Sequence, residues 1–226
     1  MSRTGIRVAI DGPSGTGKSS VSKMVAREFG YGYLDTGAMY RALTWWCVDQ
    51  QIDLADVDAV VAQANSFDLR MGTDPSNPTV AVGERSIDQE IREHALTVLI
   101  APVATNLGVR AVMKQRQRDL MESLAAEHGG VVAEGRDITT VVAPDAEVRI
   151  LMTASEEARL ARRSKELSAS VEATRAQIVD RDRSDATVSQ FLTAADGVTT
   201  IDTSQLTFEQ SVQAVLQVIG EATGRG

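Results

Sequence analysis

Hydrophobic positions near the start of the chain switch between two spacings. The apolar run 6–10 has the length of a short buried strand, and apolar residues within 20–29 recur at three- and four-residue intervals, which is typical of a helix. A second strand is predicted at 31–34. It is followed by a helix that Asp35 or Thr36 can cap at its N-terminus.

A different texture begins after this second helix. Residues 53–65 predict a short helix, whereas 67–87 hold short alternating runs broken by turn residues, which indicates a small β insertion. An apolar segment at 96–100 is expected to end near Pro102. A long helix follows over about 109–127.

The remaining apolar runs predict three further strands, at 131–133, 148–152 and 198–201, and an amphipathic helix at 207–219 closes the chain. Strands that alternate with helices favour a parallel sheet with helices on both faces. The expected fold class is therefore α/β, a three-layer fold with a central parallel sheet.

Between the last two strands, the chain is rich in arginine and poor in apolar residues. A helix is expected to start after Ser155, a polar break covers 164–170, and another helix spans about 171–185. Two polar helices joined by a serine-rich turn fit a mobile helical lid. An exposed helical hairpin with surface salt bridges is the plainer alternative.

Composition narrows the class of protein. With 226 residues the chain fits one domain with insertions, and its net charge of -8 argues against general binding to nucleic acid or to an acidic membrane. Cys47 is the single cysteine, which excludes an intramolecular disulfide and fits a reducing cytoplasm. No apolar run reaches 18 residues, so no membrane span is expected. A soluble, cytoplasmic monomer is the default expectation.

The chemistry centres on the turn after the first strand. Its sequence has the pattern Gly-x-x-x-x-Gly-Lys-Ser, from Gly12 to Ser19, between a predicted strand and a predicted helix. Glycines leave room for backbone N–H groups to face an anion at the start of a helix. Lys18 can reach the β- and γ-phosphates of a nucleoside triphosphate, and the Ser19 hydroxyl can ligate Mg²⁺. The sequence therefore predicts a phosphate-binding loop.

Cationic side chains recur at places where a parallel sheet binds its ligands. Arg136 and Asp137 follow a predicted strand, and Arg41 lies about one turn into a capped helix. Further arginines gather in the predicted lid, where Arg181 and Asp185 are spaced to pair or to grip one ligand. A solvated helix face explains any one cluster by itself. Together they suit phosphoryl transfer, which needs positioning and charge neutralisation, while the absence of an Asn-Lys-x-Asp base reader weakens a GTPase interpretation.

A set of motifs in a fixed order resembles the bacterial cytidylate kinases, a family of P-loop nucleoside monophosphate kinases. The motifs are Gly12–Ser19, 34–41 (Leu-Asp-Thr-Gly-Ala-Met-Tyr-Arg), 134–138 (Glu-Gly-Arg-Asp-Ile) with 141–145, 153–155, and Arg181-Asp-x-x-Asp185. The resemblance covers almost the whole chain. It implies transfer of the ATP γ-phosphate to CMP or dCMP with Mg²⁺. It also implies one kinase domain, with a core of about 1–35, 108–153 and 189–226, a nucleoside-monophosphate-binding region of about 36–107, and a lid of about 154–188.

The resemblance also implies a role for each matching residue. The ATP phosphates would be held by Gly12, Pro13, Ser14, Gly15, Thr16, Gly17, Lys18, Ser19 and Ser20, with Ser19 also on Mg²⁺. The acceptor would be held at its phosphate by Arg41 and Arg136, at its base by Thr36, Arg110 and Asp137, and at its sugar by Arg181 and Asp185. The transferring phosphate would be neutralised by the lid cations Arg159, Arg162 and Arg163.

Three positions depart from the family pattern. Ala101 replaces a frequent serine, Val188 replaces an expected arginine, and Phe191-Leu192 stands where a proline-leucine pair is usual. Loss of a charged hydrogen bond to substrate costs about 1.5–3 kcal/mol. Two alternatives therefore stay open: a kinase of another small acceptor such as UMP or shikimate, and a nucleotide-binding module with reduced turnover.

Overall fold

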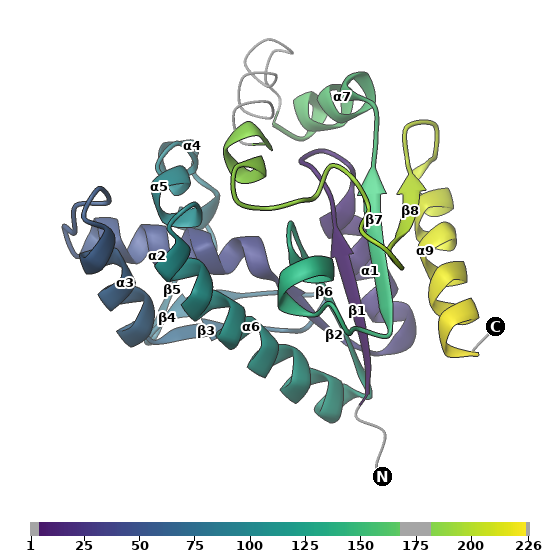
Figure 1. Cartoon of the computed structure of the whole chain (residues 1–226), viewed down its shortest axis with the longest axis horizontal. Helices are drawn as coiled ribbons and strands as arrows, with labels where there is room; N and C mark the ends of the chain where they lie inside the picture. Colours follow the sequence, from purple (N-terminus) through teal and green to yellow (C-terminus); the bar gives the residue numbers. More distant parts are fainter. Residues whose placement is uncertain (1–4, 168–181, 225–226) are drawn as a thin grey trace.

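The computed structural model describes residues 5–167 and 182–224 of the chain (Figure 1). Its centre is a five-stranded sheet in the order β2-β6-β1-β7-β8, in which every neighbouring pair is parallel. The strands are β1 (Ile6–Asp11), β2 (Gly32–Asp35), β6 (Gly130–Gly135), β7 (Val148–Thr153) and β8 (Thr199–Asp202). The predicted α/β class and parallel sheet are confirmed.

Alternation along the strands supplies two cores. Val8 and Ile10 of β1 face one side with α1 (Lys18–Phe29) and α9 (Phe208–Thr223), while Ala9 faces the other side with α6 (Leu107–His128). Both faces of the sheet are therefore covered, as parallel sheets require. Figure 1 shows α9 next to β8, at one edge of the sheet, and α6 running across the face opposite to that of α1 and α9.

Local signals explain where the long helices begin and end. The Asn106 side chain accepts from the Gly108 and Val109 amides and so caps α6, which ends at Gly129 in a left-handed conformation with φ 72°. Thr207 and Gln210 form a capping box at the start of α9. Asp35 caps α2 (Thr36–Asp49) by accepting from Ala38, as the sequence predicted.

The region between α2 and α6 lies to one side of the sheet (Figure 1). It contains α3 (Val57–Ser66) and a three-stranded antiparallel sheet, the predicted β insertion, with the strands β3 (Leu69–Met71), β4 (Val80–Val82) and β5 (Arg85–Ser86). A 3₁₀ turn at Glu90–Arg92, α4 (His94–Thr97) and α5 (Ile100–Ala104) follow. Pro102 does not end its segment as predicted. It lies in the first turn of α5, where a missing amide donor costs nothing.

The predicted lid is described in part. Its first helix, α7 (Glu156–Leu167), starts after Ser155, whose hydroxyl accepts from the Ala158 amide. The helix continues through 164–167, so the predicted polar break does not begin at 164. Most of the predicted helix 171–185, including Arg181, lies outside the described residues. Residues 182–186 are helical. Within the described ranges, no helix is long and apolar enough to cross a membrane.

Candidate active site

The phosphate-binding loop leaves β1 and enters α1 through three glycines with positive φ. A Cβ on Gly12, whose φ is 153°, would lie 2.1 Å from the Met152 carbonyl oxygen. A Cβ on Gly15, whose φ is 82°, would lie 2.8 Å from the Arg159 carbonyl oxygen. Both positions therefore exclude larger residues. Gly17 caps α1 with a φ of 90° and no side-chain hydrogen bond, and a helix N-terminus of this kind favours an anion.

A cleft of about 390 Å³ lies next to this loop. Residues at the carboxyl ends of β2 and β6 line it, together with α1, α2 and the β insertion, which contributes Met71 and Thr79. Six cationic side chains and two acidic ones face it: Lys18, Lys23, Arg41, Arg92, Arg136 and Arg163 against Asp35 and Glu134. This excess of positive charge suits an anionic, polyphosphate ligand.

Glu134 is the buried carboxylate at the centre of the cleft. The Tyr33 hydroxyl donates to its Oε1 at 2.5 Å, and its Oε2 lies 3.9 Å from the Lys18 ammonium nitrogen. Burial, followed by the nearby charge of Asp35, raises the pKa of Glu134, while Lys18 and hydrogen bonds from Ser19 and Tyr33 act in the opposite direction. The lysine of the phosphate loop is thus held against a fixed carboxylate.

Arg136 lies on the cleft wall and makes three ionic or polar contacts. Its Nη2 donates to Ser14 Oγ at 2.8 Å, its Nη1 lies 2.8 Å from Asp182 Oδ1, and its Nε lies 2.6 Å from Asp185 Oδ2. Its guanidinium also lies over the ring of fully buried Phe191, 4.4 Å from the ring centre. The predicted acceptor-phosphate residue is therefore held by two carboxylates.

Asp182, the first of the helical residues 182–186, contacts the phosphate loop. Its Oδ1 accepts from the Ser14 amide at 3.2 Å, and its Oδ2 forms an ion pair with Arg159. Arg159 also donates to the Ser14 carbonyl at 3.0 Å. An acidic side chain thus contacts a loop amide and two arginines, donors of the type that bind phosphate oxygens.

The predicted base-reading residues are only partly assembled. Arg110 donates from Nη2 to Asp137 Oδ2 at 2.6 Å and to the buried Ser189 hydroxyl at 2.8 Å. Burial raises the pKa of Asp137, and Arg110 acts against this shift. Neither residue lines the described cleft, and the hydroxyl of buried Thr36 donates to the Glu134 carbonyl at 2.7 Å.

The three predicted lid cations lie at or beside the phosphate loop, but their partners differ. Arg163 lines the cleft, and Arg159 contacts the loop beside it. Arg162 donates to the Thr203 carbonyl at 2.5 Å and the Thr203 hydroxyl at 3.0 Å, and also to the carbonyl of the loop residue Thr16 at 3.4 Å, so it fastens α7 both to the segment after β8 and to the phosphate loop. Helical spacing predicted a shared face for all three, and Arg159 and Arg162 both reach the phosphate loop. The spacing did not predict the additional bonds from Arg162 to Thr203.

Arg41 and Asp185 complete the predicted acceptor residues within the described ranges. Arg41 lines the cleft and donates from Nη1 to the Ile91 carbonyl at 3.1 Å and the Thr97 hydroxyl at 3.0 Å. Asp185 contacts Arg136, as described above.

Several residues at the cleft were missed by sequence reasoning. Tyr33, Lys23 and Arg92 line it, and Asp182 and Ser189 contact its arginines. Tyr33 sits in an apolar strand, which gave no sign of a polar role. Glu134 did carry a signal, since it opens the Glu-Gly-Arg-Asp motif, two residues before Arg136.

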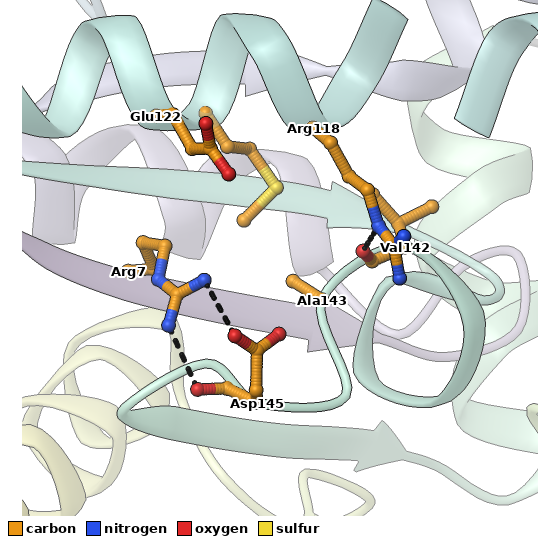
Figure 2. A pocket seen from close by; sticks show the side chains of 7 residues that line it. Arg7, Arg118, Glu122, Val142, Ala143 and Asp145 are labelled. Carbon is orange, nitrogen blue, oxygen red and sulfur yellow. Dashed lines mark hydrogen bonds and ion pairs between the residues drawn. The ribbon is translucent and has the colours of Figure 1, made fainter. Parts of the chain in front are cut away.

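A second cavity of about 320 Å³ lies away from the phosphate loop (Figure 2), between α6 and the segment leading into β7. We call it the Arg7 pocket; its lining residues are Arg7, Arg118, Met121, Glu122, Val142, Ala143 and Asp145. Arg7 Nη1 lies 3.0 Å from Asp145 Oδ2, and Arg118 Nε donates to the Val142 carbonyl at 2.5 Å. The positive charges of Arg7 and Arg118 equal in number the negative charges of Glu122 and Asp145 in this lining.

The fold and the site define a class: an α/β protein with a phosphate-binding loop and a cationic cleft beyond the carboxyl ends of its strands. Comparison with known proteins narrows this class. The family model described as cytidylate kinase matches residues 8–221. The chain belongs to the cytidylate kinase family.

Individual relatives agree over nearly the whole chain. The cytidylate kinase of Streptomyces avermitilis is 46% identical over 216 residues, covering 95% of this chain and 92% of the relative. The cytidylate kinase of Rhodococcus opacus is 42% identical and covers 100% of both chains. Among solved structures, an uncharacterized protein from Eubacterium ventriosum has a TM-score of 0.52 at 11% identity, covers 95% of this chain and 98% of its own, and supports the fold alone.

Proposed function

We propose that this chain transfers the γ-phosphate of ATP to CMP or dCMP in the cleft beside the phosphate loop, giving ADP and CDP or dCDP. The observation that carries the proposal is the cleft itself, in which six cationic side chains face two acidic ones. Membership of the cytidylate kinase family supports the choice of nucleotides. No observation favours UMP or shikimate as the acceptor, or a module without turnover.

The ATP phosphates would bind the loop from Gly12 to Ser20, with Lys18 on the transferring group. Mg²⁺, when bound, would neutralise phosphate charge. The Ser19 hydroxyl and the buried Glu134 carboxylate both line the cleft, and oxygen donors of this kind fit the ion. Within the described ranges, no three acidic, histidine or cysteine side chains form a metal cluster. Phosphate and water oxygens would therefore complete its shell.

The acceptor half of the proposal uses the residues opposite the loop. Arg41 and Arg136 would bind the phosphate of CMP. Phosphate oxygens would replace the Asp182 and Asp185 carboxylates as the partners of Arg136. Arg110, Asp137 and Thr36 would bind the base. Arg181 and Asp185 would bind the sugar.

Transfer then requires neutralisation more than proton removal. The acceptor phosphate is already anionic, so a strong general base is unnecessary. Arg159, beside Ser14, and Arg163, in the cleft wall, would offset the charge of the moving phosphoryl group. Arg162 would act indirectly by holding α7 in place. We keep the division of the kinase domain into three parts: a core of about 1–35, 108–153 and 189–226, an acceptor-binding region of about 36–107, and a lid of about 154–188.

The proposal extends to a monomer that acts in the cytoplasm without a nucleic-acid partner. Its support is the net charge of -8 and the single, buried Cys47. Size-exclusion chromatography with light scattering tests it; a dimer mass would contradict the monomer.

The deciding experiment measures ADP release with ATP and Mg²⁺ against CMP, dCMP, UMP, AMP and shikimate, in the wild type and in Val188→Arg. Turnover with CMP and dCMP is expected, at least tenfold above the other acceptors. Weak turnover rescued by Val188→Arg would locate a defect at the lid. Turnover with none of the acceptors in either protein would overturn the proposal.

A further inference from the structure

The pair formed by Tyr33 and Glu134 is a polar feature of the cleft that the phosphate-loop motif does not include. β2 pairs with β6, and Tyr33 lies opposite Val132, two residues before Glu134. Residues two apart on a strand share a face, so both side chains point toward the side of the sheet where α1 begins. A tyrosine is long enough to reach such a diagonal neighbour.

The geometry of this pair is tightly constrained. Tyr33 is 2% exposed, and its hydroxyl donates to Glu134 Oε1 at 2.5 Å. The ring belongs to the same buried cluster as Val8, Ile10 and Val132. Its amide also donates to the Thr73 carbonyl at 2.9 Å, which ties this strand to the β insertion. The phenol is therefore a fixed donor on a rigid element, and it holds one oxygen of Glu134 in place.

The other oxygen faces the phosphate loop. Glu134 Oε2 lies 3.9 Å from the Lys18 nitrogen, and both side chains line the cleft. Lysine has four rotatable side-chain bonds, so a fixed carboxylate narrows the positions of its ammonium group. Asp35, at the end of the same strand as Tyr33, repels Glu134. Ser19 also hydrogen-bonds Glu134, so loss of the phenol would remove one of the two hydrogen bonds that restrain the carboxylate beside Lys18.

We propose that Tyr33 is a positioning residue of the transfer reaction, which acts through Glu134 to hold the Lys18 ammonium in the phosphate loop. The expected effect on kcat rests on the proposed function. The coupling between Tyr33, Glu134 and Lys18 does not depend on it. Tyr33 contacts no reacting atom in this scheme. Its effect must therefore pass through Glu134.

A double-mutant cycle with Tyr33→Phe, Glu134→Gln and the double variant tests this coupling. The readouts are kcat and KM for ATP at saturating CMP, KM for CMP at saturating ATP, and the Kd for ATP in the presence of a metal chelator. Tyr33→Phe should lower kcat about tenfold and weaken metal-free ATP binding about threefold, with KM for CMP within about twofold. In the Glu134→Gln background, the same change should cost less than about twofold. Tyr31→Phe, which alters a buried tyrosine outside the cleft lining, is the matched control and should stay within about twofold of wild type.

Two outcomes overturn the inference: no loss in Tyr33→Phe, or an equal loss with and without the Glu134 carboxylate. If Tyr33→Phe does not fold, Glu134→Asp takes its place, since it keeps the charge but withdraws it from the phenol; wild-type activity in that variant would also overturn the inference. A wild type that is inactive with CMP would refute the proposed function alone. The metal-free ATP-binding cycle would still decide the role of Tyr33.

Discussion

The cleft and the Arg7 pocket are two cavities of similar volume, about 390 and 320 Å³, but only the cleft has an excess of one charge. Cationic side chains outnumber acidic ones six to two in the cleft, whereas the Arg7 pocket has two of each. Positive charge that its own acids do not balance attracts anions, while a neutral set of paired charges stabilises the fold. Volume alone would not separate a binding site from a structural cavity in this protein.

The carboxylates near the two cavities also differ in the direction in which their pKa values are shifted. Burial raises the pKa of Glu134 and Asp137 near the cleft. Hydrogen bonds from Arg7 lower the pKa of Asp145. Burial acts to raise the pKa of the neighbouring Glu147, but the hydrogen bonds that it accepts, chiefly from Arg7, together outweigh burial and lower this pKa. The two acids at or near the cleft thus lie in surroundings that disfavour their charged form, whereas the two acids that pair with Arg7 lie in surroundings that favour it.

The largest expected effect comes from Lys18→Ala in the cleft. Loss of the loop ammonium should reduce kcat/KM for ATP by about 10²- to 10³-fold, because it removes charge stabilisation from the transferring phosphate. Steady-state ADP release measures it. Lys165→Ala, which removes an exposed lysine of α7, should remain within about twofold of wild type. A similar loss in both variants would mean that general positive charge, not the loop position, matters.

A second comparison applies one substitution to both cavities. Arg136→Lys keeps the charge but loses the fork that contacts Ser14, Asp182 and Asp185, so kcat/KM for CMP should fall about ten- to a hundredfold. Arg118→Lys in the Arg7 pocket should leave kcat/KM within about twofold. Equal kinetic losses would show that the Arg7 pocket is coupled to catalysis and would break the contrast.

The third prediction concerns stability. Arg7→Met removes hydrogen bonds to Asp145 and Glu147 and should lower stability by about 1 kcal/mol, or about 2–4 °C in melting temperature, with activity unchanged. Differential scanning fluorimetry measures the shift. Arg70→Met, which breaks the exposed pair with Asp68, should change the melting temperature by less than about 1 °C.

The smallest effect is a pH dependence of that shift. Asp145 and Glu147 have pKa values in the folded protein below the ordinary values of 3.8 and 4.5 that they have in the unfolded chain. Their contribution to stability is therefore present above those ordinary values and is lost as pH falls through the lower, folded-state pKa values. The difference in melting temperature between wild type and Arg7→Met should therefore narrow from pH 6 to pH 3. A difference that stays constant or widens on acidification would contradict the pairing.

Much of the fold followed from local patterns. Apolar runs predicted the strands of the parallel sheet, and short alternating runs broken by turn residues predicted the β insertion. The helix cap was predicted at Asp35 or Thr36 from residue type, and the structure selects Asp35. Pro102 was placed at a boundary and instead lies in the first turn of the short helix α5. Its first-turn position is a tertiary choice, since proline fits either place.

The site divides in the same way. The sequence by itself determined the phosphate loop and the position of Arg136 after a strand, since glycine spacing and strand ends fix where backbone amides and side chains emerge. It could not determine that Arg162 turns to Thr203, that Thr36 donates to the Glu134 carbonyl, or that Tyr33 fixes Glu134. These contacts join residues 41, 98 and 101 positions apart, and only the packing of separate elements decides which partner a side chain reaches.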